Sequence, residues 1–306
     1  MTLRVALAGC AGLSKQNHQR DMYAPAFAAH PGFSIVAATG PNCQELAIEY
    51  GVPYQEELIP ADVDVLSVCV PLEERIDVVQ AALEAGRHVL ADKPVSIDPV
   101  AAQRITNQSG IFVPAHHHRF NPSIRSAGAA IAAGRIGLPW SVHADFLIGG
   151  GDPVAEGELV NFGAYPIDAV HALIGQEVWR VHAYSDGNTS TLLLDHTHGV
   201  LSTITVGRCR SSRSVQRYRI SGSHGMLMID ATKPALEVDT VAGVTRGWIG
   251  PDTVAALIED LHGAITTGRP PAVGTADMVR VARVIAAAEQ SLKTGRPVEL
   301  APEEIS

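Results

Sequence analysis

The stretch AALEAGRHVLADKP, residues 81–94, contains the end of a helix, a complete strand and a charged turn. Within Glu73–Ala85, apolar residues recur at helical spacing, and Gly86 stands where a helix is normally capped. HVLA (88–91) then predicts a short buried strand, which stops abruptly at a charged segment containing Lys93. A solvent-exposed turn and a ligand site both account for this lysine, so the surrounding pattern has to decide between them.

Strand-like and helix-like segments alternate through the first third of the chain. The predicted strands are 4–9, 33–39, 63–70, 88–91 and 111–118. The predicted helices are a stretch that ends near His30, then Glu45–Tyr50 and Glu73–Ala85. A fourth predicted helix begins at Asp98 and Pro99 and ends at Gly110. VDVLSVCV (63–70) is almost continuously apolar, as expected for a strand buried on both faces. This alternation predicts a parallel sheet with helices on both sides.

The carboxyl ends of parallel strands lie along one edge of a sheet, and ligands bind beyond that edge in proteins of this class. The predicted strand ends place these segments there: Cys10–Ser14, Thr39–Asn42, Val70–Leu72, Asp92–Pro94 and His116–Arg119. Lys93 therefore belongs to the ligand edge by topology alone, which favours a ligand site over a solvated turn.

The second half of the chain has a different pattern. A helix is predicted over 122–135 and two amphipathic helices over about 252–266 and 274–293. Between them, strand-like runs occur at 141–148 and near 178–186, 190–195, 199–207, 215–221, 225–230 and 235–240. Consecutive strands with short turns predict an antiparallel sheet.

The composition excludes several classes of protein. The chain has 306 residues, 46% of them hydrophobic, which is enough for two domains with separate cores. The net charge of −9 argues against a nucleic-acid surface, and no apolar run approaches the roughly 18 residues of a membrane helix. The four cysteines are widely spaced and lack a CxxC pair, which argues against a disulfide framework or a cysteine zinc site and favours a reducing cytoplasm.

The turn after the first strand, Gly9-Cys10-Ala11-Gly12-Leu13-Ser14, departs from the G-x-G-x-x-G pattern of dinucleotide-binding turns. Gly9 permits the tight turn, and Ser14 is small enough for close packing of helix on strand. Ala11 adds a methyl group where a diphosphate normally lies close, and a shifted turn at Gly12 would relieve the distortion.

The end of the second strand lacks the acidic residue that hydrogen-bonds the ribose 2′-hydroxyl of NAD. The residues there are Thr39-Gly40-Pro41-Asn42. Without a carboxylate nothing repels a 2′-phosphate, and Thr39 and Asn42 can donate hydrogen bonds to one. No Arg or Lys follows at the usual place, so the sequence favours NADP over NAD only slightly and leaves weak or absent binding open.

Segments along nearly the whole chain carry a family resemblance. They are the first strand and turn, Val70-Pro71, AALEAGRHVLADKP (81–94), HHHRFNP (116–122), NFGAYPIDAVHALIG (161–175) and TGRPP (267–271). Together they resemble the Gfo/Idh/MocA oxidoreductases, a family named for glucose–fructose oxidoreductase, inositol dehydrogenase and a rhizopine-catabolism protein. AGRHVLADKP is quite specific, with Asp92 where the family has Glu.

The resemblance implies a Rossmann domain over residues 1–118 and an α+β domain over 119–306, whose large, mostly antiparallel sheet often mediates oligomers. It implies a homo-oligomer, dimer or tetramer, formed through that sheet, and a small-molecule substrate. Lys93 would lie next to nicotinamide and substrate, with a cis bond before Pro94 as one option. The implied cofactor-binding residues are Gly9, Ala11, Gly12, Leu13, Ser14, Thr39, Gly40, Asn42, Val70, Pro71, Lys93 and Pro94.

Hydride transfer between a carbon and nicotinamide needs a proton partner that reaches the reacting oxygen and titrates near the working pH. The resemblance implies that Lys93 takes this role. An exposed lysine has a pKa of about 10.4, which is too high, but burial or a neighbouring cation lowers it.

The second catalytic segment of the family, D-x-x-x-H-x-x-D, falls on Asn161, Tyr165 and Asp168. This spacing places the three side chains on one helical face. Tyr165 is expected to hydrogen-bond the reacting oxygen, whereas Asn161 cannot titrate and removes one link of the proton relay known from inositol dehydrogenases. Asp168 is expected to act in catalysis, to orient Lys93 or to bind a substrate hydroxyl, and His171 is either a substitute base or a packed histidine.

The triplet His116-His117-His118 raises the question of a metal site. On a strand, the first and third histidines face one side and the second faces the other, so one site would hold at most two of them and no metal is expected. Arg119 either clamps a carboxylate or hydroxyl group or bonds backbone carbonyls between the domains. The expected substrate-binding residues are Lys93, His116, His118, Arg119, Asn161, Tyr165, Asp168 and His171.

These features favour an NAD(P)-dependent oxidoreductase acting on a sugar, a cyclitol or a similarly polar metabolite. The alternative is a member of the same family that performs non-redox chemistry, as a lyase, dehydratase or isomerase, with weak or no binding of a dissociable nicotinamide. Ala11, Gly40 and Asn161 motivate that alternative. A non-catalytic metabolite-binding protein is a third interpretation, which Lys93 and the Tyr165/Asp168 pair argue against.

Overall fold

A computed structural model describes residues 2–10, 17–105, 110–210, 213–232, 236–240, 243–247 and 252–301. By its contacts the chain forms two compact units, the first made of Met1–His116 with Val254–Ala282 and the second of His117–Thr253 with Arg283–Ser306. The segment Val254–Ala282 thus packs with the N-terminal part of the chain, although it follows the whole second sheet in sequence. No helix among the described residues is long and apolar enough to cross a membrane.

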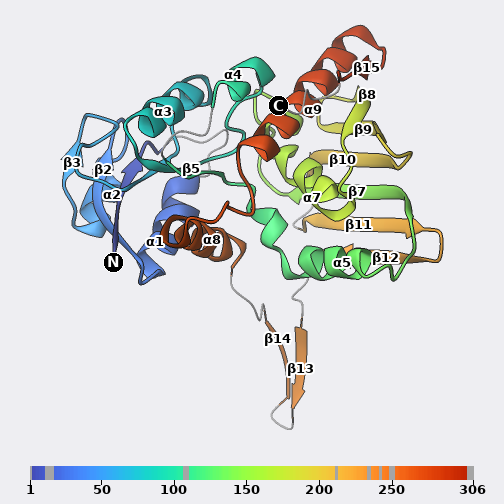
Figure 1. Ribbon diagram of the computed structural model, residues 1–306, viewed down its shortest axis with the longest axis horizontal. Helices are drawn as coiled ribbons and strands as arrows, with labels where there is room; N and C mark the ends of the chain where they lie inside the picture. The colour runs from blue at the N-terminus through green and yellow to red at the C-terminus, as the bar shows by residue number, and fades with distance from the viewer. Residues whose placement is uncertain are drawn as a thin grey trace. The chain divides into compact units, whose positions relative to one another are not determined.

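The first unit contains a sheet of six parallel strands in the order β3-β2-β1-β4-β5-β6 (Figure 1). The strands are β1 Leu3–Ala8, β2 Phe33–Thr39, β3 Tyr54–Gln55, β4 Val65–Val68, β5 His88–Ala91 and β6 Phe112–Pro114. The order proceeds outward from β1 to β3 and then restarts on the other side of β1 with β4. This reversal is the switch point at which open α/β sheets bind dinucleotides, and the strand order is that of the Rossmann fold.

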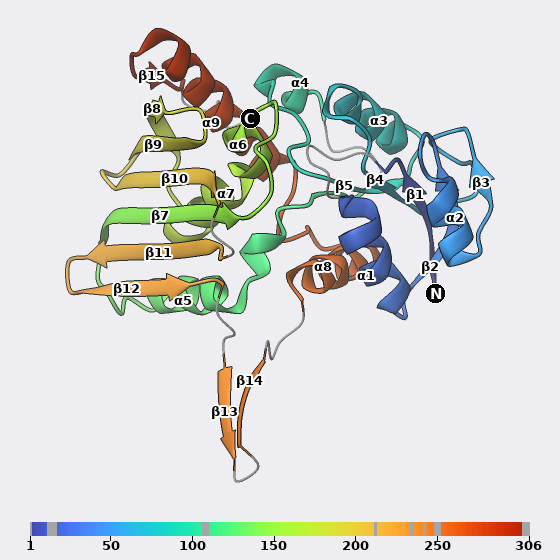
Figure 2. The same cartoon turned by 180° about the vertical axis from the view of Figure 1, so that it is seen from behind.

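Helices lie on both faces of this sheet, with α1 and α8 on one side and α3 and α4 on the other (Figures 1 and 2). The helical segments are η1 Gln19–Tyr23, α1 Ala24–Ala29, α2 Gln44–Tyr50, α3 Leu72–Glu84, α4 Pro99–Gln103, α8 Thr253–Thr267 and α9 Thr275–Thr294, of which η1 is a π-helix. The first residue of α8, Thr253, and the last part of α9 belong to the second unit. The predicted parallel sheet covered by helices is confirmed.

The core of the first unit follows from the apolar spacing of the sequence. All four residues of β4 are buried, and α3 buries the face that carries Ile76, Val79 and Leu83. These residues join one apolar cluster with β4, β5 and the start of α9, to which Met278 contributes. Burial of this cluster on both faces of the sheet is what an almost continuously apolar strand such as 63–70 requires.

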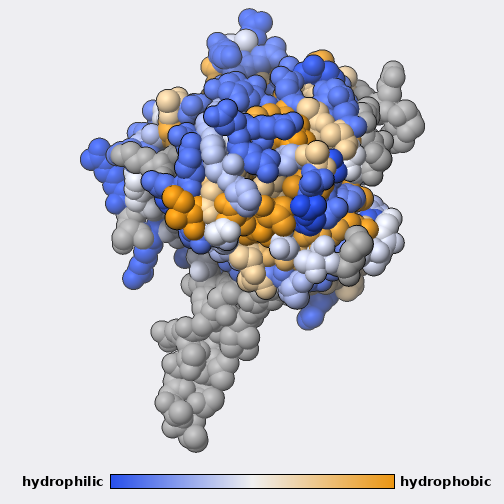
Figure 3. Space-filling model, turned by 90° about the vertical axis from the view of Figure 1, so that its left-hand side faces the viewer, coloured by the Kyte–Doolittle hydropathy of each residue, from blue (hydrophilic) through white to orange (hydrophobic). Residues whose placement is uncertain are grey.

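The surface of the side on which α2 and β3 lie is mixed. Apolar residues gather near the middle of this view and hydrophilic residues surround them (Figure 3). Ile48 of α2 is 82% exposed, and Tyr54 of β3 is also exposed. Single exposed apolar side chains are common on protein surfaces, so no function is assigned to them.

The second unit contains a sheet of seven strands in the order β12-β11-β7-β10-β9-β8-β15. Its strands are β7 Pro139–Gly149, β8 Val178–Ser185, β9 Thr189–His196, β10 Leu201–Cys209, β11 Val215–Gly222, β12 Gly225–Asp230 and β15 Val298–Glu299. Only β7 and β10 pair in parallel, so the predicted mostly antiparallel sheet is confirmed. A separate two-stranded sheet joins β13 Leu236–Thr240 to β14 Gly243–Gly247.

Four helical segments of the second unit precede or interrupt this sheet. They are η2 His117–Phe120, α5 Pro122–Ala132, α6 Glu158–Phe162 and α7 Ala164–Ile174. Alternate residues of the strands are buried under α5, α6 and α7, as in β9 and β10. The opposite face, called the open face below, has strands and no helix in front of them within the described part of the chain (Figure 2).

Two predicted elements differ from the structure. The strand expected over 111–118 ends at Pro114, and His117–Phe120 forms a 3₁₀ helix instead. The cause lies downstream, because the side chain of Asn121 accepts a hydrogen bond from Ser123 N and starts α5 at Pro122, which leaves room only for a tight turn. The helix expected to end at Gly110 ends at Gln103, where the hydrogen bonds shorten to i→i−3 type.

Gly9 provides a stability test of the turn that follows β1. It has φ +78°, and a Cβ placed there would lie 2.7 Å from Val70 Cγ1 and 2.8 Å from Cys69 O. Gly51 also has a positive φ, +63°, but a Cβ there would meet nothing within 4 Å. Gly9→Ala should therefore cost about 1–3 kcal/mol of stability more than Gly51→Ala, measured by urea unfolding, because only Gly9 adds an overlap to the backbone strain. Equal losses in the two variants would show that the turn is loosely packed.

Candidate functional site

The carboxyl ends of β1, β2, β4 and β5 carry most of the predicted first-unit site residues. These strands are parallel neighbours, with Ala8 paired to Thr39 and to Val68, and Val68 paired to Ala91. Parallel strands in this register end at the same edge of the sheet. The segments that follow them, including Gly9, Gly40, Val70 and Lys93, therefore lie along one edge, as predicted.

Arg75 joins two of the segments at this edge. It stands in the first turn of α3 and is 0% exposed. Its guanidinium donates to Val70 O at 2.8 Å from Nη2, to Pro94 O at 2.7 Å from Nη1 and to Asp92 O at 3.3 Å. Because a guanidinium is planar and carries its donors in fixed directions, these bonds set the separation between the end of β4 and the segment after β5.

Asp92 is the anion that balances this buried cation. Its carboxylate lies 3.3 Å from Arg75 Nη2, accepts a hydrogen bond of 2.6 Å from the Tyr23 hydroxyl and lies 3.0 Å from His18 Nδ1. Burial raises the pKa of Asp92, but the charges of Arg75 and His18, the His18 hydrogen bond and the charge of Lys93 outweigh it and hold the pKa well below its usual range. Asp92 is therefore ionised at neutral pH and forms the negative centre of the edge.

Lys93 follows directly and is 1% exposed, and the Lys93–Pro94 peptide bond is cis. A lysine in a solvated turn keeps its ammonium group in water, so burial excludes that interpretation of HVLADKP. The segment is instead held from inside by Arg75 through the carbonyls of Asp92 and Pro94. The catalytic role of Lys93 stays a prediction.

Arg75 and Asp92 were not among the predicted site residues, although the sequence contains a signal for the arginine. Arg75, Val79 and Ala82 are spaced by four and three residues and so share the buried face of α3. A charged residue on an apolar helical stripe needs a buried partner. The same periodicity that located the helix therefore also pointed to a buried ion pair.

The predicted cofactor residues at the ends of β1 and β2 have distinct environments. Ala11, Gly12, Leu13 and Ser14 lie outside the described residues. The hydroxyl of Thr39 is buried and donates to Leu58 O at 3.0 Å, so its proton is engaged within the protein. Asn42 is exposed and has φ +63°, a conformation that asparagine tolerates better than most residues.

These residues fit a nicotinamide dinucleotide in two respects. The backbone at Gly9 and at Gly40 has positive φ, and a Cβ at either position would overlap a neighbour, Val70 or Leu58. Glycines thus keep the surface at the ends of β1 and β2 free of side chains where a diphosphate and ribose must approach the backbone. The contacts of Val70, Pro71 and Pro94 with a cofactor stay predictions.

In the second unit, Tyr165 of α7 belongs to a chain of buried hydrogen bonds. Its hydroxyl lies 2.9 Å from His117 Nε2, and His117 Nδ1 lies 2.7 Å from Thr253 Oγ1. The ring of His118 packs on Tyr165 with 4.4 Å between ring centroids and on Phe146 at 5.0 Å. A histidine between two hydroxyls can hold its proton on either nitrogen, so the chain can pass a proton in either direction.

His117 is the functional candidate that the sequence-based prediction missed. The prediction placed 111–118 on a strand and turned His117 away from its neighbours, which is wrong because the residue lies in η2. In this 3₁₀ helix both His117 and His118 contact Tyr165. The signal for the turn was Asn121-Pro122, which marks the start of a helix so close to Pro114 that a strand reaching residue 118 leaves little room for a turn.

Arg119 and Asp168 form a bidentate ion pair in the same unit. Arg119 Nε donates to Asp168 Oδ2 at 2.9 Å and Nη2 donates to Oδ1 at 2.5 Å. Arg119 thus binds a carboxylate of the protein itself, and its contact with a substrate stays a prediction. The Tyr218 hydroxyl is buried on the same inner face without a hydrogen-bond partner among the described residues.

Asn161 and His171 have partners of their own. Asn161 Nδ2 donates to Glu158 Oε2 at 3.3 Å, and Glu158 is paired with Arg208 at 2.8 Å. His171 lies in the last turn of α7, with Nδ1 3.2 Å from Gln176 O. His116 is buried at the end of the first unit. The substrate contacts of these residues stay predictions.

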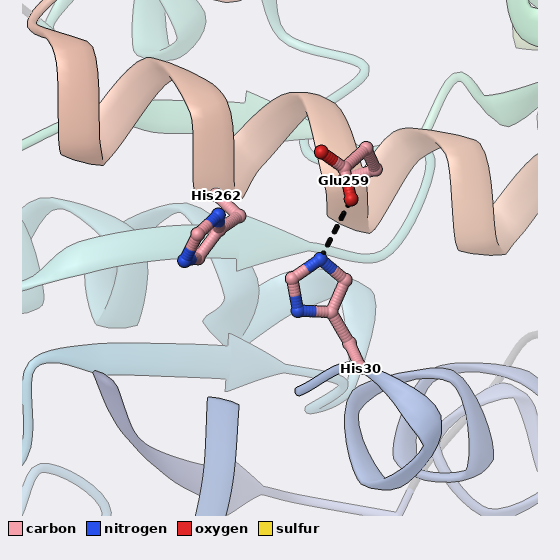
Figure 4. Close-up of side chains that lie close together, drawn as sticks. All are labelled: His30, Glu259 and His262. Atoms are coloured by element: carbon pink, nitrogen blue, oxygen red, sulfur yellow. Dashed lines mark hydrogen bonds and ion pairs between the residues drawn. The ribbon is translucent and has the colours of Figure 1, made fainter. Parts of the chain in front are cut away.

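A third group of polar residues, His30, Glu259 and His262, has the composition of a metal site (Figure 4). His30 Nδ1 accepts a hydrogen bond from Gly32 N at 3.0 Å, so the neutral ring carries its proton on Nε2 and donates it to Glu259 Oε2 at 2.9 Å. His30 Nε2 then has no lone pair for a metal. These hydrogen bonds are those of a histidine–glutamate pair, so we do not assign a metal to the cluster.

Comparison with known proteins matches both halves of the chain to family models. One is described as the oxidoreductase family with an NAD-binding Rossmann fold and matches residues 3–108. The other is described as the GFO/IDH/MocA C-terminal domain and matches residues 124–228. Together they include the segments that hold Lys93 and Tyr165.

Individual relatives are similar over most of their length. D-xylose 1-dehydrogenase (NADP(+)) 2 of Haloferax volcanii is 27% identical over 305 residues, covering 89% of this chain and 92% of the relative. Myo-inositol 2-dehydrogenase of Thermotoga maritima is 24% identical over 291 residues, covering 84% and 86%. The crystal structure of scyllo-inositol dehydrogenase from Lactobacillus casei with bound NAD(H) and scyllo-inositol has a TM-score of 0.83 at 17% identity, covering 98% and 99%, which shows a shared fold.

The buried carboxylate makes a pH-dependent prediction. Asp92→Asn should lower the free energy of unfolding by about 3–5 kcal/mol near neutral pH, because Arg75 is left as an unpaired buried charge. The pKa of Asp92 is depressed in the folded state, so its stabilisation is complete above about pH 5 and is lost as the pH falls below the unfolded value of about 3.9.

Urea titrations of wild type and Asp92→Asn should therefore give stability curves that run parallel above about pH 5 and draw together as the pH falls from there through about 3.9 toward the depressed pKa of folded Asp92. Curves that stay parallel over that interval would mean that Asp92 is not held ionised by its neighbours.

Proposed function

The chain belongs to the Gfo/Idh/MocA family of oxidoreductases, and we propose that it transfers a hydride between a nicotinamide dinucleotide and a hydroxyl or carbonyl carbon of a sugar, cyclitol or similarly polar metabolite. The observation that carries this proposal is the buried Lys93 at the carboxyl edge of a sheet with Rossmann strand order. A lysine is withdrawn from water at considerable cost and is retained where its proton is used.

A nicotinamide dinucleotide supplies the hydride acceptor or donor when it is bound. Lys93 Nζ takes the hydroxyl proton when an alcohol is oxidised and returns a proton to oxygen when a carbonyl is reduced. Burial favours the neutral amine that accepts a proton, whereas the adjacent Asp92 carboxylate favours the ammonium that donates one. The two effects oppose each other, which suits a group that must work in both directions.

Tyr165 binds the reacting oxygen in this proposal, and His117 serves as its proton partner. The 2.9 Å contact between the Tyr165 hydroxyl and His117 Nε2 supports this role, as does the further contact to Thr253. Asn161 cannot titrate and is engaged with Glu158, so it leaves that role to another residue. His117 is titratable and lies in hydrogen-bond contact with Tyr165.

Polar groups of the second unit support a polar substrate. Asp168 and Arg119 offer acceptor and donor atoms on α7 and η2, and the buried Tyr218 hydroxyl is unsatisfied among described residues. An apolar ligand would leave the Tyr218 hydroxyl unpaired, whereas a ligand hydroxyl can pair with it, so this group favours a hydroxylated ligand. The names of the relatives, a D-xylose dehydrogenase and a myo-inositol dehydrogenase, support a polyhydroxylated substrate.

The proposed cofactor is NADP, with only a slight preference over NAD. No carboxylate stands at the end of β2 in Thr39-Gly40-Pro41-Asn42, so a 2′-phosphate meets no negative charge there. Asn42 is exposed and free to donate, whereas the Thr39 hydroxyl is engaged with Leu58 O. The relative from Haloferax volcanii is named as NADP-dependent, which supports the same preference.

The proposal is tested by cofactor titration followed by turnover of a lysine variant. Calorimetry with NADPH and NADH should give micromolar affinity for at least one of them, with NADPH tighter. With polyols and keto-sugars as substrates, Lys93→Met should lower kcat/KM by at least about 100-fold, because the side chain keeps its volume but loses the proton carrier.

Cofactor affinity of Lys93→Met should stay within about threefold of wild type, which separates loss of chemistry from loss of binding. Turnover that survives this substitution would remove Lys93 from the mechanism. Absence of micromolar affinity for both cofactors would favour the lyase, dehydratase or isomerase alternative.

The proposed oligomer is a dimer or tetramer assembled through the open face of the second sheet. Leu193, Leu201 and Met228 project from this face and are 44%, 57% and 76% exposed. Apolar side chains that recur on one face of a sheet are typical of a surface that a second copy covers. The cytoplasmic location predicted from the sequence stays a prediction.

Light scattering after size-exclusion chromatography tests this surface. Replacing Leu193 and Met228 by Glu should lower the mass toward that of the monomer, because buried charges oppose association. Ile48→Glu, at an exposed apolar residue of the first unit, is the control and should leave the mass unchanged. Retention of wild-type mass by the Leu193/Met228 variant would place the interface elsewhere.

A further inference from the structure

Two cysteines that are far apart in sequence meet beside the predicted cofactor turn. Cys10 follows Gly9 directly after β1, and Cys43 immediately precedes α2 after β2. Their sulfur atoms lie 3.0 Å apart, and both are free thiols. A disulfide bond is about 2.05 Å long, so a relative shift of about 1 Å would bring the sulfurs to bonding distance.

The backbone explains why the pair forms despite the spacing of 33 residues. β1 and β2 are parallel neighbours, and Gly9 N donates to Thr39 O at 2.9 Å, which carries the pairing past the end of β1. The two loops therefore leave the sheet side by side. The wide spacing of the cysteines in sequence argued against a pair, but β1 and β2 are neighbours and bring Cys10 and Cys43 together.

The two thiols differ in a way that suits exchange chemistry. The hydrogen bond from Cys43 lowers the pKa of Cys10, with further lowering by Asn17 and Arg20 against an opposing effect of burial. The same hydrogen bond and burial raise the pKa of Cys43. Cys10 is thus the attacking thiolate, it is only partly buried, and Cys43 is the thiol that resolves the oxidised form.

We propose that Cys10 and Cys43 form a reversible disulfide that weakens cofactor binding. The effect on cofactor binding rests on the proposed function, whereas the disulfide itself does not. A peroxide is the class of oxidant that fits. The Cys10 thiolate attacks the peroxide, whose O–O bond breaks, and the products are a sulfenic acid at Cys10 and, after protonation, water. The Cys43 sulfur then displaces the hydroxyl group as a second water, so two electrons pass from the two sulfurs to one peroxide. A dithiol reductant reverses the change.

The effect on the cofactor follows from where the bond lies. Cys10 is flanked by Gly9 and by the predicted residues Ala11–Ser14, and Cys43 follows the predicted residue Asn42. In dinucleotide-binding folds the diphosphate lies at the first of these turns and the ribose at the end of the second strand. A bond between the sulfurs draws the segments after β1 and β2 together. The space between them, which a ribose has to enter, becomes narrower.

The experiment compares the full-length protein before and after one equivalent of hydrogen peroxide. Peptide mass under non-reducing conditions should show Cys10 and Cys43 peptides joined with loss of two hydrogens, and denatured thiol titration should fall from four to two of the four cysteines. Affinity for NADPH should weaken at least about tenfold and return with dithiothreitol.

Variants separate this pair from general oxidation. Each variant is treated with peroxide, the excess oxidant is removed, and affinity for NADPH is measured. Cys10→Ser and Cys43→Ser should keep the affinity of the reduced protein. Cys209→Ser should lose affinity as wild type does. Cys209 is also partly buried, but it lies in the second unit on β10. It is therefore a matched thiol with no second cysteine in its own unit, since the other three cysteines belong to the first unit.

Three results would overturn the inference: no joined peptide, a bond to Cys69 or Cys209 instead, or unchanged affinity in the joined form. A reduced protein that binds neither cofactor would overturn the proposed function and the effect on affinity, while the peptide masses would still decide whether the disulfide exists.

Discussion

The ion pair between Arg75 and Asp92 is the interaction on which the first unit's functional edge depends. Both side chains are almost completely buried, and the guanidinium also bonds the carbonyls of Val70 and Pro94. Taking two charges out of water costs several kcal/mol per ion, which the pair recovers only if the remaining hydrogen-bonding capacity is filled. Tyr23 and His18 fill this capacity at Asp92 Oδ1, whereas Oδ2 has only the 3.3 Å ion pair with Arg75 and no hydrogen-bond partner among the described residues. The result is a fixed backbone at the residue that follows, Lys93.

The second unit shows the same principle. Arg119 and Asp168 neutralise one another on the inner face of the sheet, and the hydroxyl of Tyr165 is held by His117. In both units a polar group of chemical interest is positioned by a partner from another element rather than by its own. Arg75 belongs to α3 and acts on the end of β5, and His117 belongs to η2 and acts on α7. Substitutions at Arg75 and His117 are therefore expected to act through the groups that these two residues position.

Much of the fold could be predicted because its apolar periods are strong. The strands at 33–39 and 88–91 match the structure residue for residue, and α3 begins one residue before the predicted start. The exceptions arose where short-range polar contacts decide the backbone. The helix cap at Asn121 ended the strand before the histidine triplet, and a periodic pattern of apolar residues contains no information about that.

The site could be predicted only where topology or motif identified it. Lys93 follows from the strand–helix alternation, whereas the pairing of Tyr165 with His117 joins residues 48 positions apart through tertiary packing. Cys10 and Cys43 likewise meet only because β1 and β2 are neighbours. Arg75 was not named among the predicted site residues, although it shares the buried face of α3 with Val79 and Ala82.

The most direct measurement is hydrogen–deuterium exchange of the peptide that covers residues 88–98 in Arg75→Ala and Arg75→Lys. If the guanidinium fixes this segment, both variants should exchange its amides faster than wild type, while a peptide covering β2 at 33–39 keeps its protection. Lysine retains the charge but cannot make the same set of directed bonds. Unchanged protection of 88–98 in both variants would contradict the account, because the segment presenting Lys93 would then be held in place without Arg75.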